Sequence, residues 1–217
     1  MHLNKFPKVE LHAHLDGSVR LETVSELLQK KLEQSDLVAP NKCQDLNEYL
    51  TKFSLPISVM QTKENLKRIA KELALDLKND GVIYAEIRFA PINHTQNLTL
   101  DEVVESVLEG LKSVDIKTNL ILCLMRNSNL EENKQIINLA HKYLKRGVCA
   151  LDLAGAEGIY KTKNFEELFT LANDLNIPFT IHAGEADGIE SIESAIRFGA
   201  KRIGHGIRCI ESKETMD

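Results

Sequence analysis

The sequence predicts an α/β fold built on a parallel sheet. Short apolar runs rich in Val, Ile and Leu alternate with segments whose apolar residues recur at a helical spacing. Such runs are typical of strands buried on both faces, and a regular alternation of strand and helix indicates a parallel sheet. An open doubly wound sheet and a (β/α)8 barrel both fit this alternation. The position of the reactive side chains has to decide between them.

Six strands are expected. The apolar runs that predict them are 8–14, 82–90, 118–125, 148–154, 178–183 and 202–207. Glycine precedes three of these runs and follows a helical segment each time, at Gly81, Gly147 and Gly199. A glycine in the left-handed conformation often ends a helix in this way, so these positions mark helix ends.

Apolar stripes predict four helices between the strands. They lie at residues 66–77, 100–111, 165–175 and 189–196, and Thr62 is expected to cap the first of them. Residues 18–81 form a connection much longer than a βα unit needs. We therefore expect a helical insertion there, with helices at 21–32 and 46–53, inside one domain that spans residues 1–217.

Composition excludes several classes of protein. The chain has 217 residues, a formal net charge of -5, 43% hydrophobic residues and 27% charged residues, as in an ordinary soluble protein. No basic cluster suggests nucleic acid as a partner, and no apolar run suggests a membrane span. Residues 1–8 lack the apolar stretch of a signal peptide, so a cytoplasmic protein is expected. Its four cysteines are expected to be buried, reduced thiols: Cys43, Cys123, Cys149 and Cys209.

The first reactive motif closes the first predicted strand. His12 and His14 are two residues apart, so both side chains should project from the same face of that strand, opposite Leu11 and Ala13. Two adjacent imidazoles can bind one metal ion. An H-x-H pair can equally be two unrelated polar residues near a strand end, so this motif alone leaves both interpretations open.

Two further motifs lie at the ends of later strands. His182 ends an apolar run, and Glu185 follows it after Ala183 and Gly184, a small and flexible pair that can turn the carboxylate back toward the strand end. His205 lies between two glycines, which leave its ring accessible. Each of these histidines, taken alone, is more simply interpreted as a structural or turn residue.

Taken together, the motifs favour a metal site. Four histidines and a glutamate follow three strands at the carboxyl ends, where parallel α/β folds place their active sites. His2, His94 and His141 lie elsewhere in the sequence and are expected at the surface. We therefore expect a zinc site at the mouth of a (β/α)8 barrel, with about six of its eight βα units present.

The same segments resemble the adenosine deaminase family of the amidohydrolase superfamily. The likeness covers essentially the whole chain, and the matching segments occur in the family's order at fitting intervals. They are Pro7–Ser18, Leu151–Glu157, His182–Glu185 and Arg202–Gly206. The resemblance implies a TIM-barrel enzyme that converts adenosine or 2′-deoxyadenosine into inosine or 2′-deoxyinosine and ammonia, as in purine salvage, with one zinc ion per chain.

The resemblance also implies a role for each residue. His12, His14 and His182 would be the zinc ligands. Glu185 would protonate N1 of the purine, and His205 would act on the attacking water as a base or electrostatic partner. At the substrate, His14 would also be a binding residue, Asp16 would bind the ribose 5′-hydroxyl, and the backbone of Gly155 would contact a ring nitrogen. The residues that resemble the apolar lid helix of the family are Leu46, Tyr49, Leu50 and Phe53; a simple packing stripe is almost as good an interpretation.

These residue types suit the chemistry of purine deamination. Attack at C6 needs hydroxide near neutral pH, and zinc lowers the pKa of a water that it binds to about 7. A proton on the ring nitrogen makes C6 electrophilic, and a glutamate kept protonated by burial can supply it. The H-x-E and P-C-x-x-C pattern of the other zinc deaminases does not occur, so that class is not expected.

One part of the family pattern is not found. The resemblance implies an aspartate pair after the last strand, and Asp217 does not match it. We therefore expect a fragment of the barrel, with doubtful activity and a tendency to self-associate through open strand edges. An inactive zinc-binding remnant is the alternative of another class. Within the family, a deaminase of adenine or of a modified purine nucleoside or nucleotide is the other alternative, although Asp16 favours a nucleoside.

Overall fold

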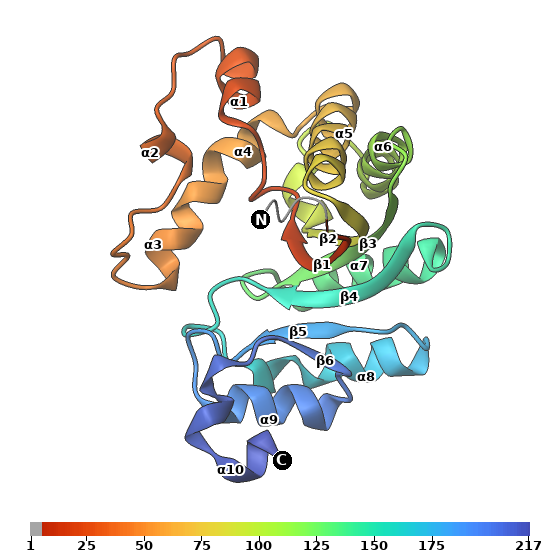
Figure 1. Ribbon diagram of the computed structural model, residues 1–217. Coiled ribbons are helices and arrows are strands. Elements are labelled where there is room, and N and C mark those ends of the chain that lie inside the picture. The colour runs from red at the N-terminus through yellow and green to blue at the C-terminus, as the bar shows by residue number, and fades with distance from the viewer. Residues whose placement is uncertain (1–5) are drawn as a thin grey trace. The chain divides into compact units, whose positions relative to one another are not determined.

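The computed structural model describes residues 6–217, and its six strands confirm the predicted order (Figure 1). The strands are β1 Lys8–His14, β2 Val82–Phe89, β3 Lys117–Met125, β4 Val148–Ala154, β5 Thr180–Ala183 and β6 Arg202–His205. β5 begins after Pro178, which has no N–H to donate to a neighbouring strand. The carbonyl of Pro178 still accepts the N–H of Leu151 at 2.9 Å.

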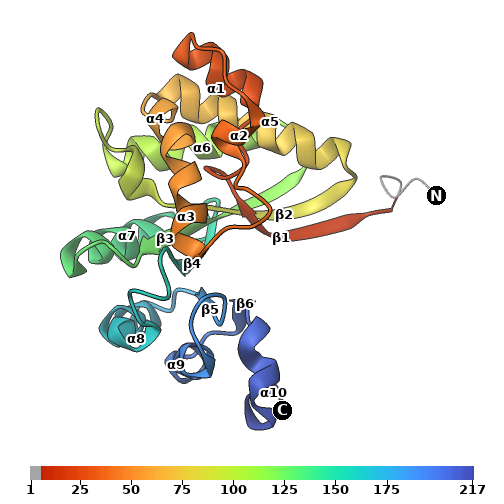
Figure 2. The same ribbon diagram turned by 90° about the vertical axis from the view of Figure 1, so that its left-hand side faces the viewer.

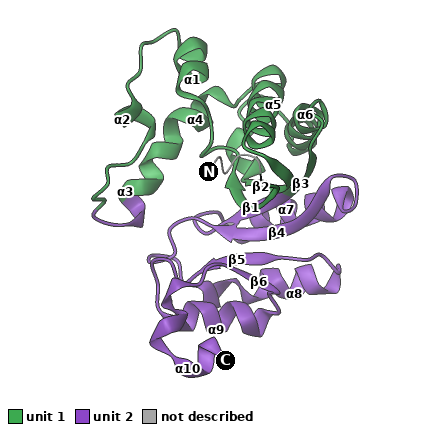
Figure 3. Ribbon diagram, viewed as in Figure 1, with its two compact units in different colours: residues 1–43, 48–120 green, residues 44–47, 121–217 purple. Residues whose placement is uncertain are grey.

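Contacts group the chain into two compact units (Figure 3). Unit 1 consists of Met1–Cys43 and Glu48–Leu120, and unit 2 of Gln44–Asn47 and Ile121–Asp217. The strand order of the first sheet is β1-β2-β3-β4. A second sheet has the order β5-β6.

In unit 1, β1 and β2 pair in parallel, from Lys8 opposite Val82 to His14 opposite Arg88. Helices α5 Lys63–Asn79 and α6 Leu100–Lys112 lie side by side over one face of these strands in both views (Figures 1 and 2). Their apolar stripes are buried, as the sequence predicts, because each helix turns that face toward the sheet. Thr62 caps α5 as predicted, and its side chain accepts the N–H of Asn65 at 3.2 Å.

The region predicted as an insertion is helical. Its short helices are α1 Leu21–Leu28, α2 Gln34–Leu37, α3 Leu46–Leu50, the 3-10 turn Thr51–Phe53 and α4 Ser54–Val59. The predicted helix 21–32 ends earlier than expected, at Leu28, because Gln29 adopts the left-handed conformation with φ 51°. The predicted helix 46–53 is confirmed as one α-helical turn followed by a 3-10 turn.

In unit 2, β5 and β6 pair in parallel from Thr180 opposite Arg202 to Ala183 opposite His205. A single parallel bridge between Leu151 and Phe179 connects β4 with the start of β5. The helices are α7 Leu130–Tyr143, α8 Glu166–Asp174, α9 Ile189–Phe198 and α10 Lys213–Met216. Both α8 and α9 lie on the same side of β5 and β6 (Figures 1 and 2).

The glycines at the predicted helix ends have positive φ angles. Gly81, Gly147 and Gly199 all have positive φ, at 85°, 119° and 103°, as expected for helix ends. None of the four cysteines forms a disulfide, but only Cys123 is buried, so the predicted burial was wrong for the other three. No helix in residues 6–217 is long and apolar enough to cross a membrane. β1 ends its sheet and exposes Val9; self-association through such edges stays a prediction.

One histidine contradicts the expectation of surface residues. His94 is 0% exposed, packs against Phe89, and places Nδ1 3.1 Å from the carbonyl oxygen of Met60. The 3-10 turn Pro91–His94 after β2 folds this ring into the core of unit 1. Burial lowers the pKa of His94 to about 4. His141 is exposed as predicted, and His2 lies outside the described residues.

Candidate metal and catalytic site

The end of β1 presents two histidines side by side. The ring centroids of His12 and His14 are 5.4 Å apart, and the rings are tilted by 40°. Both side chains are half-buried, and they share one face of the strand as the two-residue spacing predicts. A local irregularity in the pairing of β1 with β2 lies between Glu10 and Ala13, where the His12 N–H donates to the Glu10 carboxylate at 2.7 Å.

Asp16 follows these histidines and is buried. It is 5% exposed, and its Oδ1 atom has no hydrogen-bond partner among the described residues. Burial raises the pKa of Asp16 to about 7, although hydrogen bonds from its own N–H and that of Gly17 oppose this shift. A buried carboxyl oxygen without a partner is costly, which is typical of a group that receives a hydrogen bond from a ligand.

Two aromatic residues of the insertion approach the histidine pair. The Phe53 ring stands edge-on to His14, with centroids 6.3 Å apart, and the Tyr49 ring lies 5.8 Å from Phe53. Tyr49 is 46% exposed, which is more than a residue of a simple packing stripe would need. The predicted lid role of Leu46, Tyr49, Leu50 and Phe53 stays a prediction.

In unit 2, β5 carries His182 and β4 carries its buried partner. His182 Nδ1 lies 2.9 Å from Asp152 Oδ2. Asp152 is 0% exposed, and its Oδ1 accepts the N–H of Leu153 at 2.8 Å. A carboxylate behind one imidazole nitrogen favours the proton there and leaves Nε2 as the nitrogen that can bind a metal.

Glu185, two residues after β5, and His205, the last residue of β6, come together. Glu185 Oε2 lies 3.5 Å from His205 Nε2, and both side chains are partly exposed. The His205 ring centroid is 5.1 Å from that of His182. Burial lowers the pKa of His205, the Glu185 carboxylate opposes this shift, and His182 adds to it. The structure thus places the two predicted catalytic side chains next to each other, and His205 next to the predicted ligand of this unit.

The turn between His182 and Glu185 depends on Gly184. This residue has φ +70°, and a Cβ atom there would lie 2.5 Å from Ile192 Cδ1 of α9. Glycine therefore allows both the left-handed backbone and the close approach of the helix. Gly155, the other predicted contact residue, directly follows β4 with φ +108°.

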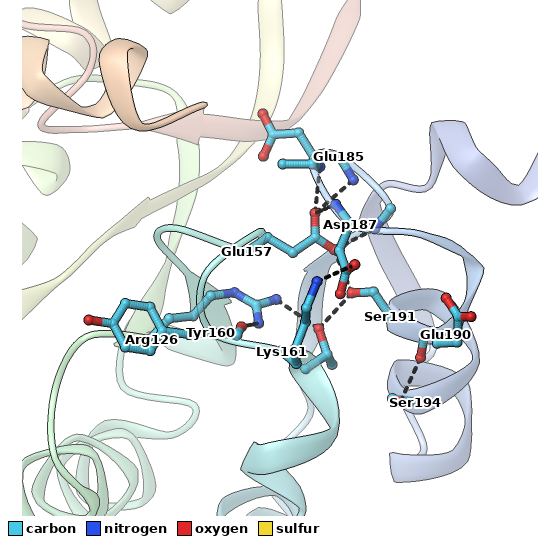
Figure 4. Close-up of polar contacts among 12 residues, drawn as sticks. Arg126, Glu157, Tyr160, Lys161, Glu185, Asp187, Glu190, Ser191 and Ser194 are labelled. Atoms are coloured by element: carbon cyan, nitrogen blue, oxygen red, sulfur yellow. Dashed lines mark hydrogen bonds and ion pairs between the residues drawn. The ribbon is translucent and has the colours of Figure 1, made fainter. Parts of the chain in front are cut away.

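Sequence reasoning assigned no role to Asp152 and Glu157. Glu157 is fully buried, and its carboxylate accepts the N–H groups of Gly184, Glu185, Ala186 and Asp187 (Figure 4). Both acids belong to the segment 151–157 that was already conspicuous in the sequence. For Asp152 the available signal was an acid inside an apolar strand, since a buried carboxylate needs specific partners; Glu157 lies beyond that strand and gave no such signal.

A metal ion has one candidate ligand set. Among the described residues, His12 and His14 of unit 1 and His182 of unit 2 are the candidate ligands of a metal ion. Imidazole nitrogens are common ligands of zinc and of several other divalent transition metals. The three residues agree with the predicted ligands, and the identity of the metal belongs to the proposal below.

Comparison with known proteins places the chain in a family. Residues 7–217 match the family model described as adenosine deaminase. The adenosine deaminase of Haemophilus ducreyi is 45% identical over 99% of this chain and 68% of its own length. That of Clostridium acetobutylicum is 46% identical over 97% of this chain and 67% of its own length.

A solved structure agrees on the fold. The N6-mAMP deaminase of Arabidopsis superimposes with a TM-score of 0.83 at 26% identity, over 99% of this chain and 69% of that one. The match confirms the α/β class with parallel strands, as part of a (β/α)8 barrel. With the family's histidines, glutamate and glycines in their expected order, the chain belongs to the adenosine deaminase family.

Proposed function

We propose that this chain carries the active-site residues of a zinc-dependent deaminase of adenosine and 2′-deoxyadenosine. The observation that carries the proposal is the identity of 45% and 46% to two bacterial adenosine deaminases over nearly the whole chain. The products would be inosine or 2′-deoxyinosine and ammonia, as in purine salvage.

The donor set fits zinc. His12, His14 and His182 would hold the ion, and Asp152 would orient His182 through Nδ1. When bound, zinc lowers the pKa of water to about 7 and so makes hydroxide available near neutral pH. Carboxylate partners behind metal-binding histidines are common in zinc proteins, and this supports His182 as a ligand.

Glu185 and His205 would carry out the proton transfers. Glu185 would donate a proton to N1 of the purine, which makes C6 more electrophilic. His205 would accept a proton from the attacking water, and its lowered pKa favours the neutral imidazole that can do so. The distance of 3.5 Å between the two side chains supports their action on adjacent atoms of one substrate.

The remaining residues would hold the nucleoside. Asp16 would accept a hydrogen bond from the ribose 5′-hydroxyl at its buried Oδ1, which has no partner among the described residues. The backbone at Gly155 would contact a purine ring nitrogen. His14 and Phe53 would line the base, which the edge-on contact of their rings supports.

Turnover and metal content of the purified chain test the proposal. We expect bound zinc, and any turnover by this chain should release ammonia from adenosine and 2′-deoxyadenosine faster than from adenine or N6-methyl-AMP. Glu185→Gln should retain zinc and lower turnover about a hundredfold or more, as expected for loss of a general acid. Glu190→Gln, an exposed carboxylate on the first turn of α9, is the matched control.

Other outcomes point to other functions. Zinc binding without any turnover would favour the non-enzymatic zinc-binding protein. Preference for adenine or for N6-methyl-AMP would assign the chain to another substrate, the second being that of its structural relative from Arabidopsis. Full activity of Glu185→Gln would remove this residue from the mechanism.

A further inference from the structure

We propose that Glu157 is the positioning residue of Glu185: its buried carboxylate holds the backbone of residues 184–187 and thereby fixes where Glu185 presents its side chain. The inference rests on the proposed role of Glu185 as general acid. It assigns a function to a charged group in the core of unit 2 that touches neither the predicted metal ligands nor the substrate residues in the proposed mechanism.

The contacts of Glu157 converge on a single loop. Its Oε1 accepts the N–H of Gly184 at 2.7 Å, and its Oε2 accepts those of Glu185, Ala186 and Asp187 at 2.9, 2.7 and 3.0 Å (Figure 4). Four consecutive N–H groups that point to one anion form the kind of concavity that binds phosphate in other proteins. Here the bound anion is a side chain of the same chain.

Only an ionised carboxylate satisfies this loop. The Ser191 hydroxyl donates to Oε1 at 2.5 Å, so five donors point at two oxygens. Burial by itself would raise the pKa of Glu157. The hydrogen bonds from Ser191 and the loop lower it by more than burial raises it, so the pKa lies below its usual value. A glutamine would turn an NH2 group toward N–H donors, because an amide offers one acceptor oxygen instead of two.

The same network reaches the predicted zinc ligand of this unit. Thr162 Oγ1 lies 2.6 Å from Ser191 Oγ and accepts a hydrogen bond from the buried Arg126 at 3.0 Å. Arg126 also donates to the carbonyl oxygen of His182 at 2.7 Å. The guanidinium supplies the positive charge that the buried carboxylate needs nearby.

A fixed backbone has a direct consequence for Glu185. Its N–H donates to Glu157 Oε2 at 2.9 Å, so the backbone is held in place and only the side chain can rotate. That side chain places Oε2 3.5 Å from His205 Nε2. Proton transfer depends on distance and direction, and displacement by about 1 Å can cost about a hundredfold in rate. Loss of the anchor should therefore slow chemistry more than it weakens substrate binding.

Two variants test the anchor. Glu157→Asp keeps the charge but is one methylene shorter and cannot reach all four N–H groups, whereas Glu157→Gln keeps the length and loses the charge. In both we expect faster hydrogen exchange of the amides of residues 184–187, kcat for adenosine lowered about tenfold to a hundredfold, and KM changed less than about threefold. Glu190→Gln should change none of these.

The outcomes separate this inference from the proposed function. Faster exchange with unchanged kcat would overturn the positioning role, and so would unchanged exchange in Glu157→Asp. If the wild-type chain does not turn over adenosine, the proposed function fails by itself. The carboxyl 13C resonance of Glu185 then decides about the anchor: a shift in Glu157→Asp supports it, and an unmoved resonance overturns it.

Discussion

The substitution Asp152→Asn tests whether the carboxylate that faces His182 Nδ1 strengthens zinc binding. The side chain keeps its volume, and an amide oxygen can still face Nδ1, so packing at this fully buried position is preserved. What is lost is the negative charge 2.9 Å from the imidazole. A hydrogen bond to a charged group contributes about 1.5–3 kcal/mol, and partners behind metal ligands contribute about tenfold to a hundredfold in affinity, or about 1.4–2.7 kcal/mol.

Both estimates agree, so zinc affinity should fall by about tenfold to a hundredfold. The assay is competition with a chromophoric chelator, with circular dichroism to show that the fold is retained. Glu190→Gln serves as control, because its carboxylate is exposed and contacts none of the proposed ligands. Unchanged zinc affinity in a folded Asp152→Asn variant would refute the reasoning and would point to a ligand set without His182.

Three further predictions concern stability. The unfolded chain protonates His94 below pH 6.5 whereas the folded chain does so only near pH 4, so stability should fall by about 3 kcal/mol as the pH is lowered across this interval; urea unfolding of His94→Asn should show a flatter pH dependence, and an identical slope would exclude this histidine. Gly110→Ala should destabilise by about 1–3 kcal/mol despite the better helix propensity of alanine, because its Cβ would clash with the Lys67 carbonyl of α5; a higher Tm would contradict the close packing of the two helices. Asn129→Ala removes the side chain that accepts the Glu132 N–H at the start of α7 and should cost about 1 kcal/mol, measured by thermal unfolding, with no loss expected for Asn127→Ala outside the cap.

Local signals in the sequence were enough for the order of the elements and for the residues at strand ends. The run from Val148 to Ala154 is apolar because both faces of β4 are buried, and Thr62 marks the start of α5 because its side chain satisfies a free N–H there. The spacing of His12 and His14 fixes a shared face because side chains alternate along a strand. These properties depend on neighbouring residues, so periodicity and residue type reveal them.

Tertiary structure alone decided which polar groups support those residues. The spacing in sequence does not indicate that Asp152 faces His182, or that Glu157 binds a loop 27 to 30 residues later, because these contacts join different strands and turns. The same holds for His94. Its polar side chain predicted a place at the surface, but the turn after β2 buries the ring in the core. Burial makes the partner of each polar group decisive, and that partner is set by how the chain packs, which no local pattern records.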